Sequence, residues 1–548
     1  FISNQIRRNK NRDARKNLLG TSYRKDPLSS ICSGMKLEHF LSSFARATPD
    51  REALRCEGRS LTFGEFDHQS TLLALYLQQN GISVGDRVLI FMHNRIEFPV
   101  AFMAIVKVGA VAVTPNPRLS STEMEYIILD AKPKAVIFEE ETQEVLKKVP
   151  LQHVKLVCVD KELSDIYDEY SMMDVAALKE LPCGFDDCLI SYTSGTTGKP
   201  KGAVLTQSNF IVSNGFANSQ QWGITTTDRI LTTTPLAHRT AFSRMMNTIC
   251  LGISIVFVRK FDPEDTANLI EKEGITLLTM VPTVARMLLP LIEAEPKRFS
   301  NLKIATATGE AFPVEVKRRL RDALPALRLY SYFAMTELGP ITSLGPLEQF
   351  EKPTSVGRIN PGVEVRLLDD HGRVVDLGGT GEIRVRTGLP GQYMTMREYF
   401  NNKEATDEAL ENGWFKTGDI GRFDMDGYLY IVDRKKDMVL SGGYNIYSKE
   451  VEEVIRQLSG VSDVAVIGVP DAIYGESVAA FIELTSGHTM NREQVIGHCK
   501  DCIASYKKPK HVYFISSLPR NSSGKVMKNV LREKFQVESA HDIDANVS

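Results

Sequence analysis

The segment YTSGTTGKPKG (residues 192–202) brings hydroxyl side chains, glycines and two lysines together directly after a short apolar run. Gly195 and Gly198 have no Cβ, so nearby backbone N–H groups can turn toward an anion, and Lys199 and Lys201 add positive charge. The hydroxyl donors of the segment are Thr193, Ser194, Thr196 and Thr197. The spacing does not fit a Walker A loop, in which Gly-Lys-Ser/Thr follows a first glycine after four residues. We therefore expect a phosphate-binding loop of another kind, which need not begin a helix.

Five further polar motifs follow this loop along the chain. They are YFAMTE (332–337), KTGDIG (416–421), DRKKD (433–437), SGGYNI (441–446) and PRNSSGKV (519–526). In this order, over roughly residues 35–535, the motifs resemble those of the adenylate-forming superfamily of acyl- and aryl-CoA ligases, luciferases and peptide-synthetase adenylation domains. The resemblance, within the acyl-CoA ligase branch, implies an AMP-forming acid–thiol ligase. A carboxylate would attack the α-phosphate of ATP to give acyl-AMP and pyrophosphate, and the thiol of CoA would then displace AMP.

The resemblance also assigns roles to ATP-binding residues. Residues 193–197 and Lys201 would hold the departing pyrophosphate, because donors and cations must already stand where its charge collects. Glu337, with Thr336 beside it, would bind Mg²⁺, since a hard cation prefers oxygen ligands. Asp419 would accept both ribose hydroxyls with its two oxygens. The remaining contacts with ribose, phosphate and adenine fall on Arg434, Phe333, Gly309, Glu310 and Ala311.

Lys525, in the last motif, matches the lysine that bridges the carboxylate and the α-phosphate during adenylation, where a cation screens two anions from each other. The thiol must later approach the same adenylate, so the resemblance implies a rotation of the small C-terminal domain between the two steps. Lys436 matches the pivot of that rotation. The residues implied to border CoA are Gly442, Gly443 and Tyr444, with Lys260 near its nucleotide end.

The segment PLAHRTAF (residues 235–242) bears on the acid substrate. It places His238 where CoA ligases carry a histidine beside the acyl carboxylate. Peptide-synthetase domains usually have an aspartate here to hold an α-amino group, and this segment contains none. An amino-acid substrate is therefore not expected.

The expected acyl pocket carries bulky residues. Tyr332, close to Ala334 in the pocket, and the segment GEAF (309–312) are larger than the residues common in fatty acyl ligases. We therefore expect a small, medium or functionalised acid rather than a long fatty chain. Arg239 or Arg244 could pair with a second carboxylate or another polar substituent; equally, either could be structural or face solvent.

These residues must be positioned by a large α/β framework. From about residue 35 to 433, short runs of Val, Ile and Leu are each followed by a polar or helix-like stretch, which is typical of mainly parallel sheets covered by helices. The expected strands are 87–92, 134–138, 154–159, 189–193, 254–258, 277–281 and 302–306, with a helix at 313–324. From about residue 357, hairpin patterns at 364–375 and 423–431 predict a small β-rich subdomain.

The pattern becomes α+β beyond the charged stretch 434–437, which has few apolar residues and suits a hinge. Helices are expected at 448–458, 491–505 and 525–535, and strands near 461–469, 476–484 and 511–515. The predicted α/β protein therefore has four parts: a basic extension (1–34), an adenylation domain (35–433, with its β-rich subdomain at about 357–433), the hinge, and a small mobile C-terminal lid domain (438–548).

Composition agrees with this organisation. With 548 residues, of which 43% are hydrophobic and 24% charged, the chain can build more than one core, and its net charge of −2 gives no reason to expect a nucleic-acid partner. The basic extension is expected to be solvated rather than bound to RNA or a membrane. No apolar window suits a transmembrane helix, and eight cysteines without framework spacing favour a reducing, cytoplasmic setting. Cys499 and Cys502, beside His498, are expected to be structural because no second pair completes a metal site.

Three other functions stay open beside the CoA ligase. A ligase that loads an acyl carrier protein would share the first half-reaction, and a luciferase-like oxygenase would use the same adenylate. A catalytically inactive nucleotide-binding scaffold belongs to a different class, and the joint presence of Glu337, Asp419, Arg434 and Lys525 argues against it.

Overall fold

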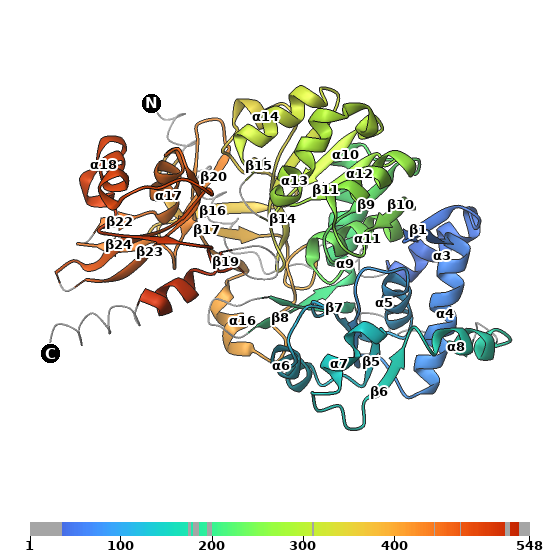
Figure 1. Ribbon diagram of the computed structural model, residues 1–548. Helices are drawn as coiled ribbons and strands as arrows, with labels where there is room; N and C mark the ends of the chain where they lie inside the picture. Colours follow the sequence, from blue (N-terminus) through green and yellow to red (C-terminus); the bar gives the residue numbers. More distant parts are fainter. Residues whose placement is uncertain are drawn as a thin grey trace, which may run out of the picture.

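The computed structural model describes residues 35–173, 177–178, 186–193, 200–309, 312–442, 444–471, 473–520 and 526–535. These residues form two large and two small β-sheets, and the last two sheets belong to the C-terminal third of the chain (Figure 1). In this described part of the chain, no helix is long and apolar enough to cross a membrane.

The first large sheet has the strand order β6-β5-β3-β4-β7-β8, and all neighbours are parallel except β7 and β8. Its strands are β3 (Arg87–Phe91), β4 (Val111–Val113), β5 (Ala135–Phe138), β6 (Lys155–Cys158), β7 (Asp187–Thr193) and β8 (Lys201–Thr206). Every residue of β5 is buried, as expected for a parallel strand covered on both faces. The helices of this region are α3 (Leu37–Ala47), α4 (Phe63–Gln79), α5 (Glu97–Lys107), α6 (Ser121–Ala131), α7 (Gln143–Leu146) and α8 (Leu163–Tyr170).

The second large sheet has the order β15-β14-β13-β12-β11-β9-β10-β1-β2. The strands from β13 to β1 are parallel, and the edge strands β14, β15 and β2 are antiparallel to their neighbours. The strands are β1 (Glu52–Cys56), β2 (Arg59–Thr62), β9 (Arg229–Thr232), β10 (Ser254–Phe257), β11 (Leu277–Met280), β12 (Ile304–Ala307), β13 (Arg328–Met335), β14 (Gly339–Leu344) and β15 (Arg358–Ile359). The helices are α9 (Gln207–Phe210), the π-helix η3 (Ile211–Ala217), α10 (Asn218–Trp222), α11 (Arg239–Leu251), α12 (Pro263–Lys272), α13 (Pro282–Ala294), α14 (Val314–Ala323) and α15 (Glu348–Glu351).

Two hydrophobic cores hold these layers together. One core runs between the two large sheets, where Phe242 of α11 contacts Phe102 of α5 edge-to-face with ring centroids 4.9 Å apart. The other lies under α12, α13 and α14, where Leu288 and Leu320 pack near Leu278 of β11. The sheets are therefore sandwiched between helices, and α11 lies between the two sheets.

The two small sheets follow in the orange and red part of Figure 1. The first contains β16 (Glu364–Leu368), β17 (Thr380–Arg386), β18 (Leu410–Glu411), β19 (Trp414–Phe423) and β20 (Leu429–Arg434), with α16 (Lys403–Ala409). The second contains β21 (Val439–Ser441), β22 (Tyr444–Ile446), β23 (Val461–Asp471), β24 (Gly475–Leu484) and β25 (His511–Ile515), with α17 (Ser448–Arg456) and α18 (Arg492–Cys502). Residues 528–535 form a last described helix.

The predicted fold class is confirmed, and the seven expected strands match β3, β5, β6, β7, β10, β11 and β12 within a few residues. The hairpin predicted at 364–375 is present but short. Residues 373–375 return antiparallel beside the end of β16, with a bridge between Leu368 and Val374 and a 2.9 Å hydrogen bond from the Asp369 N–H to the Arg373 carbonyl, whereas the longer pairing of β16 is with β17. The Asp369 carboxylate holds the turn by accepting hydrogen bonds from the backbone N–H of His371 and Arg373. The domain limits stay predictions.

Candidate active site

The loop expected to bind phosphate joins two antiparallel strands rather than a strand and a helix. Thr193 at the end of β7 lies opposite Lys201 at the start of β8. Among the predicted phosphate ligands, Ser194, Gly195, Thr196 and Thr197 lie outside the described residues. Below the loop, the Tyr192 hydroxyl donates a hydrogen bond of 2.5 Å to Asp130 Oδ2. This bond anchors the end of β7 to helix α6.

Lys201 and Glu337 are linked through a tyrosine that no sequence motif indicated. The Lys201 ammonium lies 5.3 Å from the ring centroid of Tyr399, and the Tyr399 hydroxyl donates a 2.9 Å hydrogen bond to Glu337 Oε1. The chain around Tyr399 runs beside β8, because the backbone N–H of Phe400 donates to the Gly202 carbonyl at 2.7 Å. The only sequence signal for Tyr399 is an aromatic hydroxyl within a polar stretch, which is too common to indicate a site.

Glu337 is a buried carboxylate, 7% exposed. Burial raises its pKa, while the hydrogen bond from Tyr399 and the charges of Arg239 and Arg434 oppose the rise. The Tyr399 hydroxyl and the backbone N–H of Glu337 itself both donate to this carboxylate. A carboxylate has about four lone-pair sites, so these two donors leave acceptor sites that fit a hard divalent ion. Thr336, beside it in sequence, is partly buried.

The predicted ribose ligands lie on neighbouring strands. Asp419 of β19 and Arg434 of β20 are paired in register, and Arg434 Nε lies 3.3 Å from Asp419 Oδ1. Asp419 is 5% exposed, whereas nearly half of the Arg434 side chain is exposed. A cavity beside this pair is lined by Thr417, Gly418, Arg434, Lys435 and Lys436. The carboxylate is therefore held by an arginine that itself lines this cavity.

The predicted adenine contacts lie at the ends of two adjacent parallel strands. Ala307 of β12 is paired with Ser331 of β13, so Gly309 and Phe333 each follow two residues later. Gly309 has φ +103°, a conformation that favours glycine. Ligands of open parallel sheets bind at such carboxyl-terminal strand ends. Glu310 and Ala311 lie outside the described residues.

His238 caps the start of α11 on the expected acyl side. Its Nδ1 accepts a 3.4 Å hydrogen bond from the backbone N–H of Thr240. Tyr332 lies on β13, and its hydroxyl accepts a hydrogen bond from Nε1 of the fully buried Trp222. Ala334, on the same strand, is exposed. Phe312, which was expected to add bulk to the pocket, belongs instead to the core beneath α14.

The two arginines near this side are buried, so the alternative in which either faces solvent is wrong. Arg239 and Arg244 of α11 are 9% and 8% exposed. Burial lowers the pKa of each to about 10. Both side chains therefore carry their positive charge at neutral pH inside the protein.

Those residues assigned to CoA and to the hinge that the structure describes are exposed and lie apart. Tyr444 is 59% exposed and its ring stacks on that of Tyr506, with centroids 4.7 Å apart. Gly442 has φ +58°, and Gly443 and Lys525 lie outside the described residues. Lys260 follows β10, which Figure 1 shows at the opposite end of the molecule from β22. The structure thus does not bring Lys260 and the Gly442–Tyr444 segment together.

The turn at 434–437 is tied to the C-terminal sheet by contacts that the sequence did not reveal. Asp433 accepts hydrogen bonds from the backbone N–H and the hydroxyl of Ser448, the latter at 3.0 Å. Arg532 Nη2 lies 2.9 Å from Asp437 Oδ1 and donates to the Lys436 carbonyl at 3.2 Å. These contacts fix the orientation of the C-terminal sheet in this structure.

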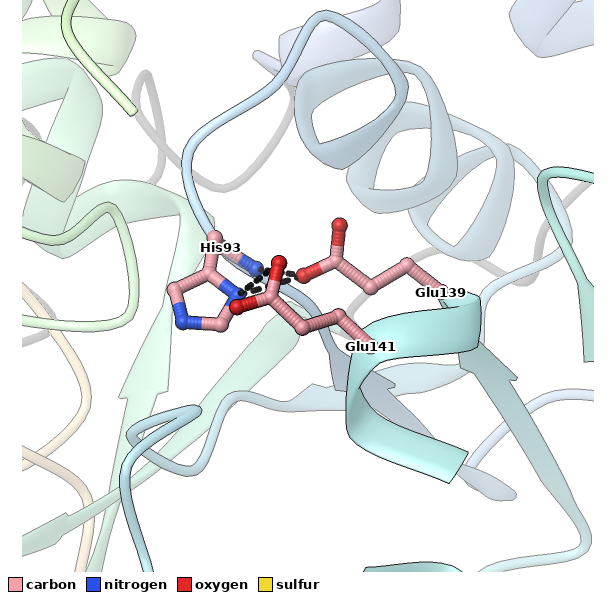
Figure 2. A group of neighbouring side chains, drawn as sticks. All are labelled: His93, Glu139 and Glu141. Carbon is pink, nitrogen blue, oxygen red and sulfur yellow. Dashed lines mark hydrogen bonds and ion pairs between the residues drawn. The ribbon is translucent and has the colours of Figure 1, made fainter. Parts of the chain in front are cut away.

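A second cluster of ionisable groups lies at the edge of the six-stranded sheet. Within the described chain, His93, Glu139 and Glu141 form the one group of three side chains with mutual distances suitable for a metal (Figure 2). Glu139 is already saturated: it accepts from the His93 ring at 2.6 Å and pairs with Arg95 at 3.1 Å and Arg259 at 2.8 Å. Although burial alone would raise the pKa of Glu139, these partners lower it to about 2. The cluster is a neutralised ion-pair network.

The cysteines of helix α18 fit the structural interpretation. Cys499 is fully buried in the core of the C-terminal sheet. The His498 ring lies 3.1 Å from the Val454 carbonyl, and Cys502 Sγ lies 3.8 Å from its Nε2. The cysteines that the structure describes are all free thiols.

Two large, mainly parallel sheets followed by two small sheets agree with the fold that the adenylate-forming resemblance implies. Residues 41–400 match the model of the AMP-binding enzyme family, and residues 450–525 match its C-terminal domain. The chain therefore belongs to the AMP-binding enzyme family, as the six motifs predicted, within its acyl-CoA ligases.

Individual relatives agree with this assignment. A long-chain-fatty-acid–CoA ligase of Mycobacterium tuberculosis is 33% identical over 87% of this chain and 93% of its own length. The indoleacetate–CoA ligase of Aromatoleum aromaticum is 32% identical, with 91% and 98% covered. Among solved structures, ATP-bound MatB of Rhodopseudomonas palustris superposes with a TM-score of 0.81 at 29% identity, covering 91% of this chain and 99% of that one. The o-succinylbenzoate CoA synthetase of Bacillus subtilis, with its acyl-adenylate, gives 0.79 at 28% identity, covering 90% and 97%.

Proposed function

We propose that this protein is an ATP-dependent carboxylate–CoA ligase that forms acyl-AMP with release of pyrophosphate and then transfers the acyl group to CoA. The observation that carries the proposal is the chain of contacts from the partly buried Lys201 through the buried Tyr399 to the buried Glu337. It joins the base of the phosphate loop to an acceptor for a divalent ion, next to the paired Asp419 and Arg434. ATP bound at these residues would meet a cation at its phosphates and a carboxylate at its ribose.

The first step needs negative charge to be stabilised where pyrophosphate departs. Lys201 and the hydroxyl-rich loop would receive that charge before it develops, so no reorganisation is needed during the reaction. Glu337 would hold Mg²⁺, which supplies charge stabilisation at the phosphate oxygens. Asp419 would accept the ribose hydroxyls while Arg434 holds its carboxylate in place. Phe333 and Gly309 would border the adenine.

His238 would stand beside the acyl carboxylate, with its Nδ1 already accepting from Thr240 N–H. The ring is thereby oriented and Nε2 can carry the proton and donate to the carboxylate. The interpretation of a small, medium or functionalised acid is supported by Trp222 and Tyr332, which fill the space beside α11 with large rings. CoA as acceptor, rather than a carrier protein, is supported by the CoA ligases among the relatives.

The two half-reactions would use two orientations of the C-terminal domain, with residues 434–437 as the hinge. The exposed Tyr444 and the distant Lys260 support this, since both are assigned to the CoA step. Lys525→Ala tests it. Adenylation should fall by roughly 100-fold or more because an electrostatic contact to the reacting groups is lost, while thiolysis of preformed acyl-AMP should be spared. Equal loss in both half-reactions would contradict the rotation.

A cytoplasmic location is part of the proposal. Its support is chemical: the described cysteines are free thiols, which suits a reducing compartment.

The activity itself is tested by a pyrophosphate-release screen over acids of varied length and polarity, each with and without CoA. At least one acid should release pyrophosphate with ATP and Mg²⁺, and CoA should convert it to a thioester with formation of AMP. Pyrophosphate release without any CoA thioester would favour the carrier-protein or oxygenase alternative. ADP formation, or no acid-dependent release, would overturn the proposal.

A further inference from the structure

Two positively charged side chains of α11 are buried with unpaired N–H donors. Within the described chain, Nη1 of Arg239 and both Nε and Nη1 of Arg244 are buried with no hydrogen-bond partner. The effective cost of withdrawing an ion from water is several kcal/mol, and buried charges are therefore normally paired. An arginine kept in this state by its fold is suited to an anion that arrives later.

Aromatic contacts compensate only part of that cost. The guanidinium of Arg244 lies 4.5 Å over the Trp222 ring, and that of Arg239 lies 4.2 Å over the Phe210 ring. A cation–π contact contributes about 0.5–2 kcal/mol, which is less than the desolvation of a full charge. The rings thus hold each guanidinium in place and leave its N–H donors for another partner.

The two arginines face different parts of the site. The negative charge of Glu337 acts to raise the pKa of Arg239. Arg239 also lies near Gly339, on the nucleotide side. Arg244 lies near Tyr332, whose hydroxyl is hydrogen-bonded to Trp222, and its positive charge also repels that of Arg239. Arg244 therefore belongs to the acyl side. It follows His238 by six residues, or about 9 Å along a helix axis.

We infer that Arg244 binds a second carboxylate at the far end of the acid substrate, so that short or medium dicarboxylic acids are the preferred substrates. This rests on the proposed function, because His238 would hold the other carboxylate during its adenylation. A guanidinium and a carboxylate form two parallel hydrogen bonds, which fix both distance and orientation. A monocarboxylic acid of the same length would leave the arginine buried without a partner.

Matched acid pairs test the inference. Butanoate and succinate, hexanoate and adipate, and octanoate and suberate are compared by kcat/KM for CoA-thioester formation with ATP and Mg²⁺. In the best-fitting pair the dicarboxylate should be preferred by roughly 100-fold or more, as for sites built to bind a polar substrate group. Arg244→Met keeps an unbranched apolar stem and removes the charge. It should abolish the preference while activity with the monocarboxylate is kept or raised.

The control is Arg321→Met, which removes an exposed arginine stacked over Phe350 and should change neither acid. If Arg244→Met does not fold, Arg244→Lys is used instead and should keep a reduced preference for the dicarboxylate. The acid pairs measured with the unaltered protein test the inference independently of any variant. Equal or better turnover of the monocarboxylate in every pair would overturn the inference and leave the ligase function intact. Proportional loss of both acids in Arg244→Met would also overturn it. Activity with no acid at all would instead overturn the proposed function.

Discussion

Arg95 and Arg259 beside the six-stranded sheet, and Arg239 and Arg244 on α11, are all largely withdrawn from solvent, yet only the first pair meets carboxylates. Arg95 contacts Glu97 at 2.7 Å and Asp160 at 2.9 Å, and Arg259 contacts Glu141 at 2.6 Å. No carboxylate of the described chain forms an ion pair with Arg244, which lies over the Trp222 ring and near the neutral hydroxyl of Tyr332. The first network is complete within the protein, whereas our inference is that a ligand completes the second.

The difference shows how this chain separates stability from binding. A neutralised cluster such as that of Figure 2 holds β3, β5 and the turn after β10 together and needs nothing from outside. Arg244 is buried with unpaired N–H donors, and Glu337 is a carboxylate whose pKa burial raises; both weaken the unliganded protein and would prepare charge for substrates. Four substitutions test whether this contrast is real.

Glu337→Gln should have the largest effect. Loss of the carboxylate that would hold Mg²⁺ should lower pyrophosphate release by roughly 100- to 1,000-fold. Thermal stability without substrates should not fall, because an amide replaces a carboxylate whose pKa burial raises. Release is measured at saturating ATP and Mg²⁺, and unfolding by circular dichroism. The exposed Glu351→Gln serves as the control. Unchanged pyrophosphate release would show that Glu337 does not take part in adenylation.

Arg95→Met and Arg244→Met should differ in stability. Breaking the paired cluster leaves carboxylates without their cation and should cost about 2–3 kcal/mol of unfolding free energy. Replacing the unpaired Arg244 by an apolar chain of similar length should be neutral or stabilising. Urea unfolding monitored by circular dichroism gives both values. A cost for Arg244→Met as large as that for Arg95→Met would show that Arg244 is structural.

Tyr399→Phe should have the smallest effect, visible in the pH profile. The Tyr399 hydroxyl lowers the pKa of Glu337 against the effect of burial, so its removal raises that pKa further. If the ionised carboxylate is the active form, activity is lost as the pH falls through the pKa. The acid limb of the pH profile of pyrophosphate release should therefore move to higher pH. The rate of release at pH values above this limb should change little. An unmoved limb would mean that Glu337 does not control this limb.

The sequence predicted most of what its ordered motifs and apolar runs encode. Parallel strands such as β5 are recognisable in the sequence as continuous apolar runs. The motifs also indicate Asp419 and Arg434, although they do not show that the two side chains pair. Tyr399 was missed because its role depends on residues 395–400 lying beside β8, a contact between distant segments. The helix expected at 491–505 ends at Cys502, since Ile503 adopts an extended backbone that composition does not reveal.

The arginines of α11 mark the limit of sequence reasoning most clearly. Their positions were noted from the sequence, but pairing, burial and solvent exposure remained open because each depends on the packing of α11 against α10 and η3. The structure buries both and leaves Arg244 beside Trp222. The structure thus shows that both charges are buried, and the property still to be measured is which anion pairs with them.

Transfer of oxygen from the acid to AMP tests the central claim most directly. The acid that is most active in the pyrophosphate-release screen, labelled with ¹⁸O in the carboxylate that is activated, is incubated with ATP, Mg²⁺ and CoA, and the nucleotide product is analysed by mass spectrometry. Attack of the carboxylate on the α-phosphate, followed by thiolysis at the acyl carbon, predicts AMP that carries one ¹⁸O atom. ADP as the product, or AMP without the label, would contradict adenylation by this site.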